Sequence, residues 1–191
     1  MVNLVDKQGY QKRLGEEFQR VLQASKFKGV IDYTWFDYHA QCKGMKVENC
    51  QKLMKSIQKQ TDAFGWMEGV FEKGELTVLR RQKGVVRTNC IDCLDRSNVL
   101  QSMLARHNLL SILKERGLSS SENIYLSDLP SGLEMVFRRT WVAHGNTLSI
   151  LYAGTPALKT DFTLLGKRTV KGVLADAKNG ITRFNLNLLN F

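Results

Sequence analysis

The chain has 191 residues, 43% of them hydrophobic and 24% charged, and its formal net charge is +10. This composition allows one domain with a sizeable core and excludes a largely disordered chain. No apolar run approaches the roughly 20 residues of a membrane span, so any membrane contact is expected to be peripheral. The basic balance suits nucleic acid, an anionic membrane or an acidic ligand equally. Four cysteines and no evident signal peptide favour a reducing, cytosolic setting.

The first quarter of the chain alternates predicted strands and helices. Val2–Val5 is a short apolar run typical of a strand. Val30–Tyr38 is rich in β-branched and aromatic residues, which also predicts a strand. Between and after these strands, apolar residues at helical spacing predict helices over Gln11–Ala24 and Met45–Phe64.

The middle of the chain predicts a hairpin, a strand and a helix. Trp66–Phe71 and Leu76–Arg81 flank Gly74, which favours a β-hairpin. Val85–Asn89 follows as a strand, and the residues after Arg96 have helical spacing as far as about Arg116.

The last third of the chain is predicted to be mostly helical. A polar loop over residues 119–130 is followed by a helix over Gly132–Tyr152, within which Gly145 is a weak point. An irregular segment, Gly154–Gly166, then precedes a helix over Thr169–Asn190. The whole order predicts a single α/β domain over residues 1–191, with a central mixed β-sheet flanked by helices.

A short segment between a predicted strand and a predicted helix carries the chemistry. Cys90 and Arg96 are separated by five residues, and Ser97 follows at once. The first N–H groups of a helix lack intrahelical partners and attract anions, so a cysteine at this place ionises more easily. The planar fork of an arginine can hold two oxygens of a phosphate. These residue types predict a thiol nucleophile that attacks phosphorus, with Ser97 donating a hydrogen bond either to the thiolate or to the thiol leaving group.

The same cysteines are also compatible with other kinds of site. Cys90 and Cys93 have the spacing of a redox dithiol or of half a zinc site. A zinc site needs a second close pair, and Cys42 and Cys50 are farther apart than is usual. A thioredoxin-like dithiol has no use for Arg96. The plainest alternative is a pair of small buried cysteines.

The wider sequence around this segment resembles the signature of the Sac-domain phosphoinositide phosphatases. The resembling string is Arg-Thr-Asn-Cys-Ile-Asp-Cys-Leu-Asp-Arg-Ser-Asn, residues 87–98. Phe36–His39, Tyr152–Phe162 and Gly166–Thr169 are similar to further segments of that family, in the same order. The resemblance covers nearly the whole chain and implies the catalytic portion of a Sac domain, without the N-terminal lobe of the family. Residues 176–180 and 184–186 depart from the family pattern.

The resemblance implies hydrolysis of the ring phosphomonoester of phosphatidylinositol monophosphates, with the 4-phosphate favoured, through a cysteinyl-phosphate. Cys90 is then the nucleophile and Arg96 holds the phosphate. Asp92 is the expected general acid, although an acid from elsewhere in the fold is an open alternative. The remaining phosphate-binding positions are Ile91, Cys93, Leu94, Asp95 and Ser97, with Asp95 also bracing the loop and the Cys93 side chain expected to be buried.

A group of charged residues downstream is expected to support the loop rather than contact phosphate; its members are Lys159, Asp161, Lys167 and Arg168. The mechanism calls for no metal and no cofactor. The expected partners are phosphoinositide headgroups, met by a cytoplasmic protein at the cytosolic face of an anionic membrane. A phosphoinositide-binding module with little or no turnover is the alternative. Nucleic acid is not expected, because no RRM-like aromatic signature or basic helix face is present.

Overall fold

The computed structural model describes residues 1–43, 48–119, 129–165 and 168–189. The chain divides into two compact units, unit 1 (Met1–Asp92 with Met103–Ser120) and unit 2 (Cys93–Ser102 with Ser121–Phe191). One helix, α4 (Asp95–Glu115), contributes residues to both units. The single domain expected from the length stays a prediction.

Unit 1 contains a small sheet of three parallel strands in the order β2-β1-β5. The central strand β1 (Val2–Asn3) pairs with β2 (Thr34–Trp35) on one side and β5 (Thr88–Asn89) on the other. The prediction of a mixed sheet is wrong, because the described strands of this sheet are all parallel and the antiparallel hairpin forms a separate pair. Parallel strands are usually buried on both faces, and β1 and the residues after it are buried accordingly.

The strands are shorter than their sequence pattern predicts. Val30–Tyr38 contributes only Thr34–Trp35 to the sheet, because Asp37 then caps the short helix α2 (Tyr38–Gln41) by accepting the Ala40 N–H at 2.9 Å. Aromatic and β-branched residues fit a half-buried surface whether or not the backbone continues a ladder. Such residues therefore overstate the length of a strand.

Two long helices of unit 1 follow their predicted positions. Helix α1 (Gly9–Ala24) lies so close to Trp35 that a Cβ on Gly15 would collide with the indole ring. Helix α3 (Glu48–Phe64) buries Leu53 and Met54 on its apolar face. Residues 45–47, predicted to open this helix, lie outside the described residues.

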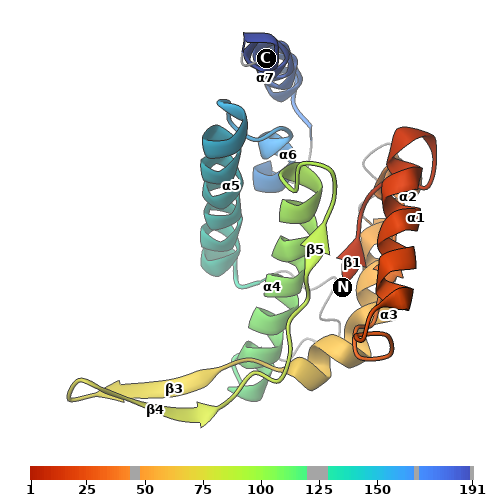
Figure 1. Ribbon diagram of the computed structural model, residues 1–191. Helices are drawn as coiled ribbons and strands as arrows, with labels where there is room; N and C mark the ends of the chain where they lie inside the picture. The colour runs from red at the N-terminus through yellow and green to blue at the C-terminus, as the bar shows by residue number, and fades with distance from the viewer. Residues whose placement is uncertain (44–47, 120–128, 166–167, 190–191) are drawn as a thin grey trace. The chain divides into compact units, whose positions relative to one another are not determined.

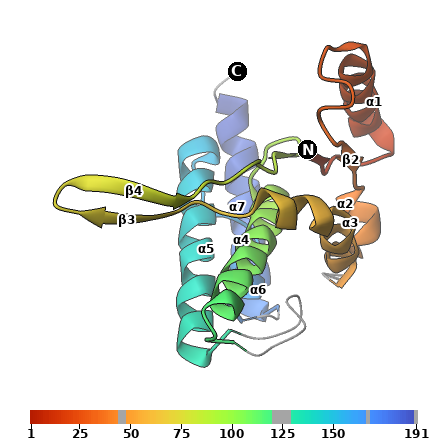
Figure 2. The same ribbon diagram turned by 90° about the horizontal axis from the view of Figure 1, so that it is seen from below.

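The predicted hairpin is confirmed. Strands β3 (Glu68–Glu72) and β4 (Glu75–Arg80) are antiparallel, and α3 leads directly into them (Figures 1 and 2). The two turn residues, Lys73 and Gly74, have φ values of 50° and 86°, which a two-residue hairpin turn requires. At its base, Arg80 pairs with Glu115 near the end of α4.

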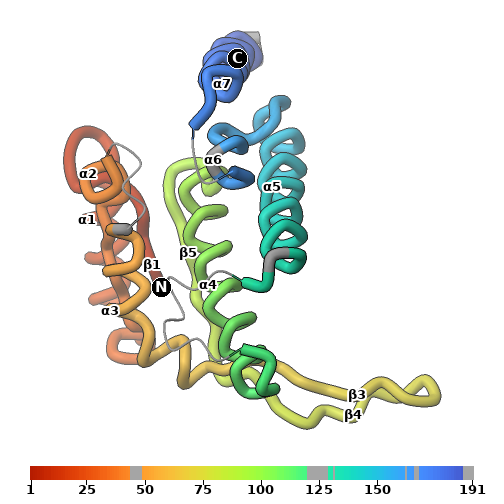
Figure 3. The backbone as a smooth tube through the Cα atoms, turned by 180° about the vertical axis from the view of Figure 1, so that it is seen from behind, coloured from red at the N-terminus to blue at the C-terminus, as the bar shows by residue number. Residues whose placement is uncertain are grey.

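Unit 2 is helical. It holds the start of α4, then α5 (Ser131–Ala153), α6 (Thr160–Leu165) and α7 (Val170–Leu189). The long helix and the last helix were predicted, but α6 lies within the segment predicted to be irregular. Helix α6 lies beside the end of α5 (Figure 3). None of the helices in the described ranges is both long and apolar enough to cross a bilayer.

The start of α4 and the middle of α5 approach each other closely at Gly145. A Cβ there would lie 2.8 Å from Asn98 Nδ2. Asn98 also donates to the Trp141 carbonyl at 3.2 Å, and its Oδ1 lies 2.9 Å from His144 Nδ1. Gly145, expected to be a weak point of the helix, is therefore where the packing leaves no room for a side chain.

Candidate active site

Cys90 lies at the carboxyl end of the parallel sheet. It follows β5 directly and is 6% exposed. Residues 90–94 join β5 to α4, as the sequence predicts. In an open sheet of parallel strands, ligands bind outside the carboxyl ends of the strands, where successive connections leave in opposite directions. Since β2 and β5 flank β1 on opposite sides, Cys90 occupies that kind of position.

Two other segments emerge at the same edge of the sheet. His39 follows β2, Asp6 follows β1, and His39 Nδ1 lies 2.9 Å from Asp6 Oδ1. Asp37 accepts the Lys7 N–H at 2.8 Å as well as capping α2. The segment Phe36–His39 therefore ties the end of β2 to the end of β1.

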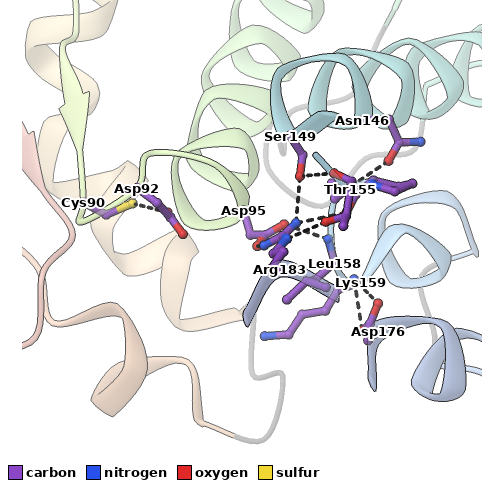
Figure 4. Close-up of polar contacts among 12 residues, drawn as sticks. Cys90, Asp92, Asp95, Asn146, Ser149, Thr155, Leu158, Lys159, Asp176 and Arg183 are labelled. Atoms are coloured by element: carbon purple, nitrogen blue, oxygen red, sulfur yellow. Dashed lines mark hydrogen bonds and ion pairs between the residues drawn. The ribbon is translucent and has the colours of Figure 1, made fainter. Parts of the chain in front are cut away.

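The first part of the loop brings the proposed nucleophile and acid together. The Cys90 Sγ atom lies 3.5 Å from Asp92 Oδ1, and both residues belong to unit 1 (Figure 4). Ile91 is exposed and Asp92 is half-buried. The thiol and the carboxyl group are thus within hydrogen-bonding distance for a sulfur donor.

Cys93 departs from expectation. Its side chain is exposed rather than buried. Its φ of 56° is a left-handed value that non-glycine residues adopt rarely. This left-handed residue lies two residues before the start of α4.

The second part of the loop opens α4 in unit 2. Leu94 and Ser97 are buried, and Arg96 is half-buried. Asp95 is the acid in the first turn of the helix, where a negative charge is favourable. Its Oδ1 accepts the Leu158 N–H at 2.9 Å, so Asp95 ties the start of the helix to the segment that follows α5.

Arg183 on α7 connects Asp95 to the residues at the end of α5 and just after it. Its guanidinium donates to Ser149 Oγ and Thr155 Oγ1, both at 2.7 Å, and to the Pro156 carbonyl at 2.9 Å (Figure 4). It also lies 3.7 Å from Asp95 Oδ2. Because Ser149 is fully buried and Arg183 is only 15% exposed, these bonds are shielded from water and hold the segment that contacts Asp95.

A second ionic cluster holds the residues before and after α6. Arg168 pairs with Asp161 and, at 2.6 Å, with Asp176. Asp161 Oδ2 accepts the Thr169 N–H at 2.7 Å, at the start of α7. Asp176 also accepts the Lys159 N–H at 2.9 Å, while the Lys159 side chain is exposed (Figure 4). Lys167 lies outside the described residues.

Comparison with known proteins decides the family. No family model matches the chain. It is 39% identical over 188 residues to the phosphatidylinositol-3-phosphatase SAC1 of Drosophila melanogaster, covering 97% of this chain and 31% of that protein. It is 39% identical over 186 residues to the phosphoinositide phosphatase SAC6 of Arabidopsis thaliana, covering 97% of this chain and 30% of that protein.

A third relative is the phosphatidylinositide phosphatase SAC2 of Homo sapiens, 37% identical over 188 residues, with 98% of this chain and 16% of that protein covered. The chain belongs to the Sac family of phosphoinositide phosphatases. It spans less than a third of the length of these curated relatives.

Two residues of the clusters described above were not picked out from the sequence. Asp176 and Arg183 were not predicted, although they lie seven residues apart on α7 and so share one helix face. A charged pair at that spacing, opposite an apolar stripe, is a signal that could have found them. Among the described residues, no group of three or more histidine, cysteine or acidic side chains is placed to hold a metal ion.

Proposed function

We propose that this chain is the catalytic portion of a phosphoinositide phosphatase that hydrolyses the ring phosphomonoester of phosphatidylinositol monophosphates. The observation that carries the proposal is the place of Cys90, a buried thiol at the carboxyl end of β5 and beside the central strand. The names of the Sac relatives, all phosphatases of phosphoinositides, support the same class of substrate.

The proposed reaction has two steps. The Cys90 thiolate forms a bond to phosphorus while the bond from phosphorus to the inositol oxygen breaks, and Asp92 gives its proton to the leaving oxygen. Water then attacks the cysteinyl-phosphate, the sulfur–phosphorus bond breaks, and the Asp92 carboxylate accepts the proton of the water. Inorganic phosphate and the free thiolate result.

Arg96 and the backbone N–H groups of residues 91–96 hold the phosphate oxygens in this proposal. A guanidinium matches two oxygens at once, and fixed donors stabilise charge that develops in the transition state. The side chain of Asp95 and the clusters around Arg183 and Arg168 keep the start of α4 in place and contact no phosphate. We assign the 4-phosphate as the first substrate to test, alongside the 3-phosphate that the name of the SAC1 relative specifies.

The test measures phosphate release from short-chain phosphatidylinositol 3-, 4- and 5-phosphates by the wild-type chain and by Cys90→Ser. We expect release by the wild type, a loss of at least about a thousandfold in the variant, and a wild-type adduct heavier by one phosphoryl group after rapid acid quenching. Circular dichroism of both proteins checks that the serine variant is folded. Equal release by both would exclude Cys90 as the nucleophile.

A binding module without turnover is the second candidate, because a basic chain can hold an anionic headgroup without hydrolysing it. The net charge of +10 suits an anionic membrane at the cytosolic face, where the headgroups lie. Liposomes with and without phosphatidylinositol 4-phosphate separate the two candidates. Headgroup-dependent binding by a folded wild-type chain that releases no phosphate would favour the module.

A further inference from the structure

Two buried cysteines lie together in unit 1 and have no part in the proposed reaction. Cys42 is 8% exposed and Cys50 is 2% exposed. Their Sγ atoms are 3.0 Å apart, only about 1 Å more than the roughly 2.05 Å of a disulfide bond. No disulfide bond joins them in this structure. The pair is therefore close to the geometry of a crosslink without being one.

The backbone around the pair already holds the two sulfurs near each other. Cys42 follows the last residue of α2, and its N–H donates to the Tyr38 carbonyl at 2.8 Å. Cys50 lies in the first turn of α3. Asn49, beside it, donates a side-chain hydrogen bond to the Gln41 carbonyl. Since the ends of both helices are fixed independently of the sulfurs, closing the bond needs a small side-chain adjustment and no rearrangement of the helices.

We propose that Cys42 and Cys50 are a site of reversible oxidative modification, at which a peroxide converts the two thiols into an intramolecular disulfide. Cys42, the more exposed of the two, attacks the peroxide; one oxygen bonds to its sulfur to give a sulfenic acid, and the other leaves as water. The Cys50 thiolate then attacks that sulfur, and the sulfenic oxygen leaves as a second water. Each thiol loses one hydrogen, and one peroxide is reduced to two waters.

The first turn of α3 favours this division of roles. The N-terminus of a helix stabilises a thiolate, so Cys50 is suited to be the attacking group. In a reducing compartment such a disulfide is transient and reports oxidation rather than serving as a permanent staple.

The crosslink would connect α3 to the helix that carries His39. Asp37 and His39 tie α2 to the residues after β1, by bonds to Lys7 and Asp6. The oxidised chain therefore has its sheet edge held covalently through α2 as well as by hydrogen bonds. We expect the oxidised form to unfold at a temperature several degrees higher than the reduced form, because a crosslink restricts the unfolded chain.

The test uses the full chain with Cys90→Ser and Cys93→Ser, which leaves only the pair in question. Hydrogen peroxide is added, remaining thiols are alkylated, and the intact mass and tryptic peptides are measured. We expect a mass lower by two hydrogen atoms, a link between peptides 29–43 and 47–52, a higher melting temperature, and return to the reduced state with dithiothreitol. Adding Cys42→Ser to the same chain should remove the link and the rise in melting temperature.

The chain with Cys90→Ser and Cys93→Ser tests the proposed disulfide even if the Cys42→Ser control does not fold. The proposal is overturned if both thiols remain fully alkylatable at peroxide concentrations that oxidise the exposed Cys93 of the wild type. It is also overturned if peroxide only adds oxygen to the two peptides without linking them.

Discussion

Asp161 and Gly172 lie so close together in unit 2 that the Asp161 carboxylate fits only because residue 172 has no side chain. A Cβ on Gly172 would collide with the Asp161 carboxylate. That carboxylate accepts the Thr169 N–H and pairs with Arg168. The absence of a side chain at position 172 therefore allows the bonds that start α7 and hold Arg168 in place.

Gly172→Ala should destabilise the chain, against the usual preference of helices for alanine. The new methyl group would push Asp161 off its partners, at a cost of about 1–3 kcal/mol in free energy of unfolding. Urea denaturation checks this. Gly180→Ala is the matched control on the same helix, because nothing lies within 4 Å of its Cβ. That control should be neutral or stabilising by up to about 1 kcal/mol, and equal losses in both variants would contradict the prediction.

Arg183→Met should remove the anchor between α7 and the end of α5. Hydrogen bonds to a charged group contribute roughly 1.5–3 kcal/mol each, and the variant leaves the buried Ser149 and Thr155 without their charged donor. We expect a loss of about 3 kcal/mol in free energy of unfolding. Lys178→Met, at an exposed position of the same helix, should change it by less than about 0.5 kcal/mol. A similar small change in Arg183→Met would show that the cluster is not structural.

Asp92 and Asp95 are predicted to separate into a chemical and a structural role. Asp92→Asn should lower kcat by about a hundredfold or more, since general acid catalysis contributes roughly 10²–10⁴, while stability changes little. Asp95→Ala should instead lower the free energy of unfolding by about 1–2 kcal/mol, because the Leu158 N–H loses its acceptor. Phosphate release and urea denaturation of both variants test the assignment. Full turnover by Asp92→Asn would assign the proton donor to another group.

The base of the β3–β4 hairpin should respond to acid. The hydrogen bond from Arg80 lowers the pKa of Glu115 below its ordinary value of 4.5. A carboxyl group whose pKa falls on folding stabilises the fold above its unfolded pKa, and this contribution is lost as pH falls through the folded pKa. Glu115→Gln should therefore reduce the loss of stability below about pH 4.5, by a small amount because the pair is exposed. Melting temperatures measured between pH 7 and pH 3 check this, and an unchanged pH profile would contradict it.

The sequence predicts the helices better than the sheet. Helices α1, α4, α5 and α7 carry apolar residues at helical spacing over many turns, and each was found within a few residues of its expected position. The strands of the parallel sheet are two residues long. Strands of that length are defined by their partners, which a local pattern does not contain.

The candidate site, too, has features that the sequence predicts and features that it does not. The order of strand, Cys90, loop and helix could be read from the sequence, because the residue types follow one another directly. The left-handed backbone of Cys93 and the exposure of its side chain could not be read in this way, since neither follows from the residue types alone. The contacts of Arg183 join residues that lie far apart in the chain, and no local pattern encodes them.

The parallel sheet has a consequence for the order in which the chain acquires structure. Its central strand ends at Asn3, but its two partners lie about 30 and 85 residues later. Contacts so distant in sequence close slowly, because a long loop must be ordered before they form. During synthesis β1 cannot pair with β5 until Asn89 has been added, and Cys90 is the next residue of the chain. The thiol therefore gains its buried position only in the event that completes the sheet.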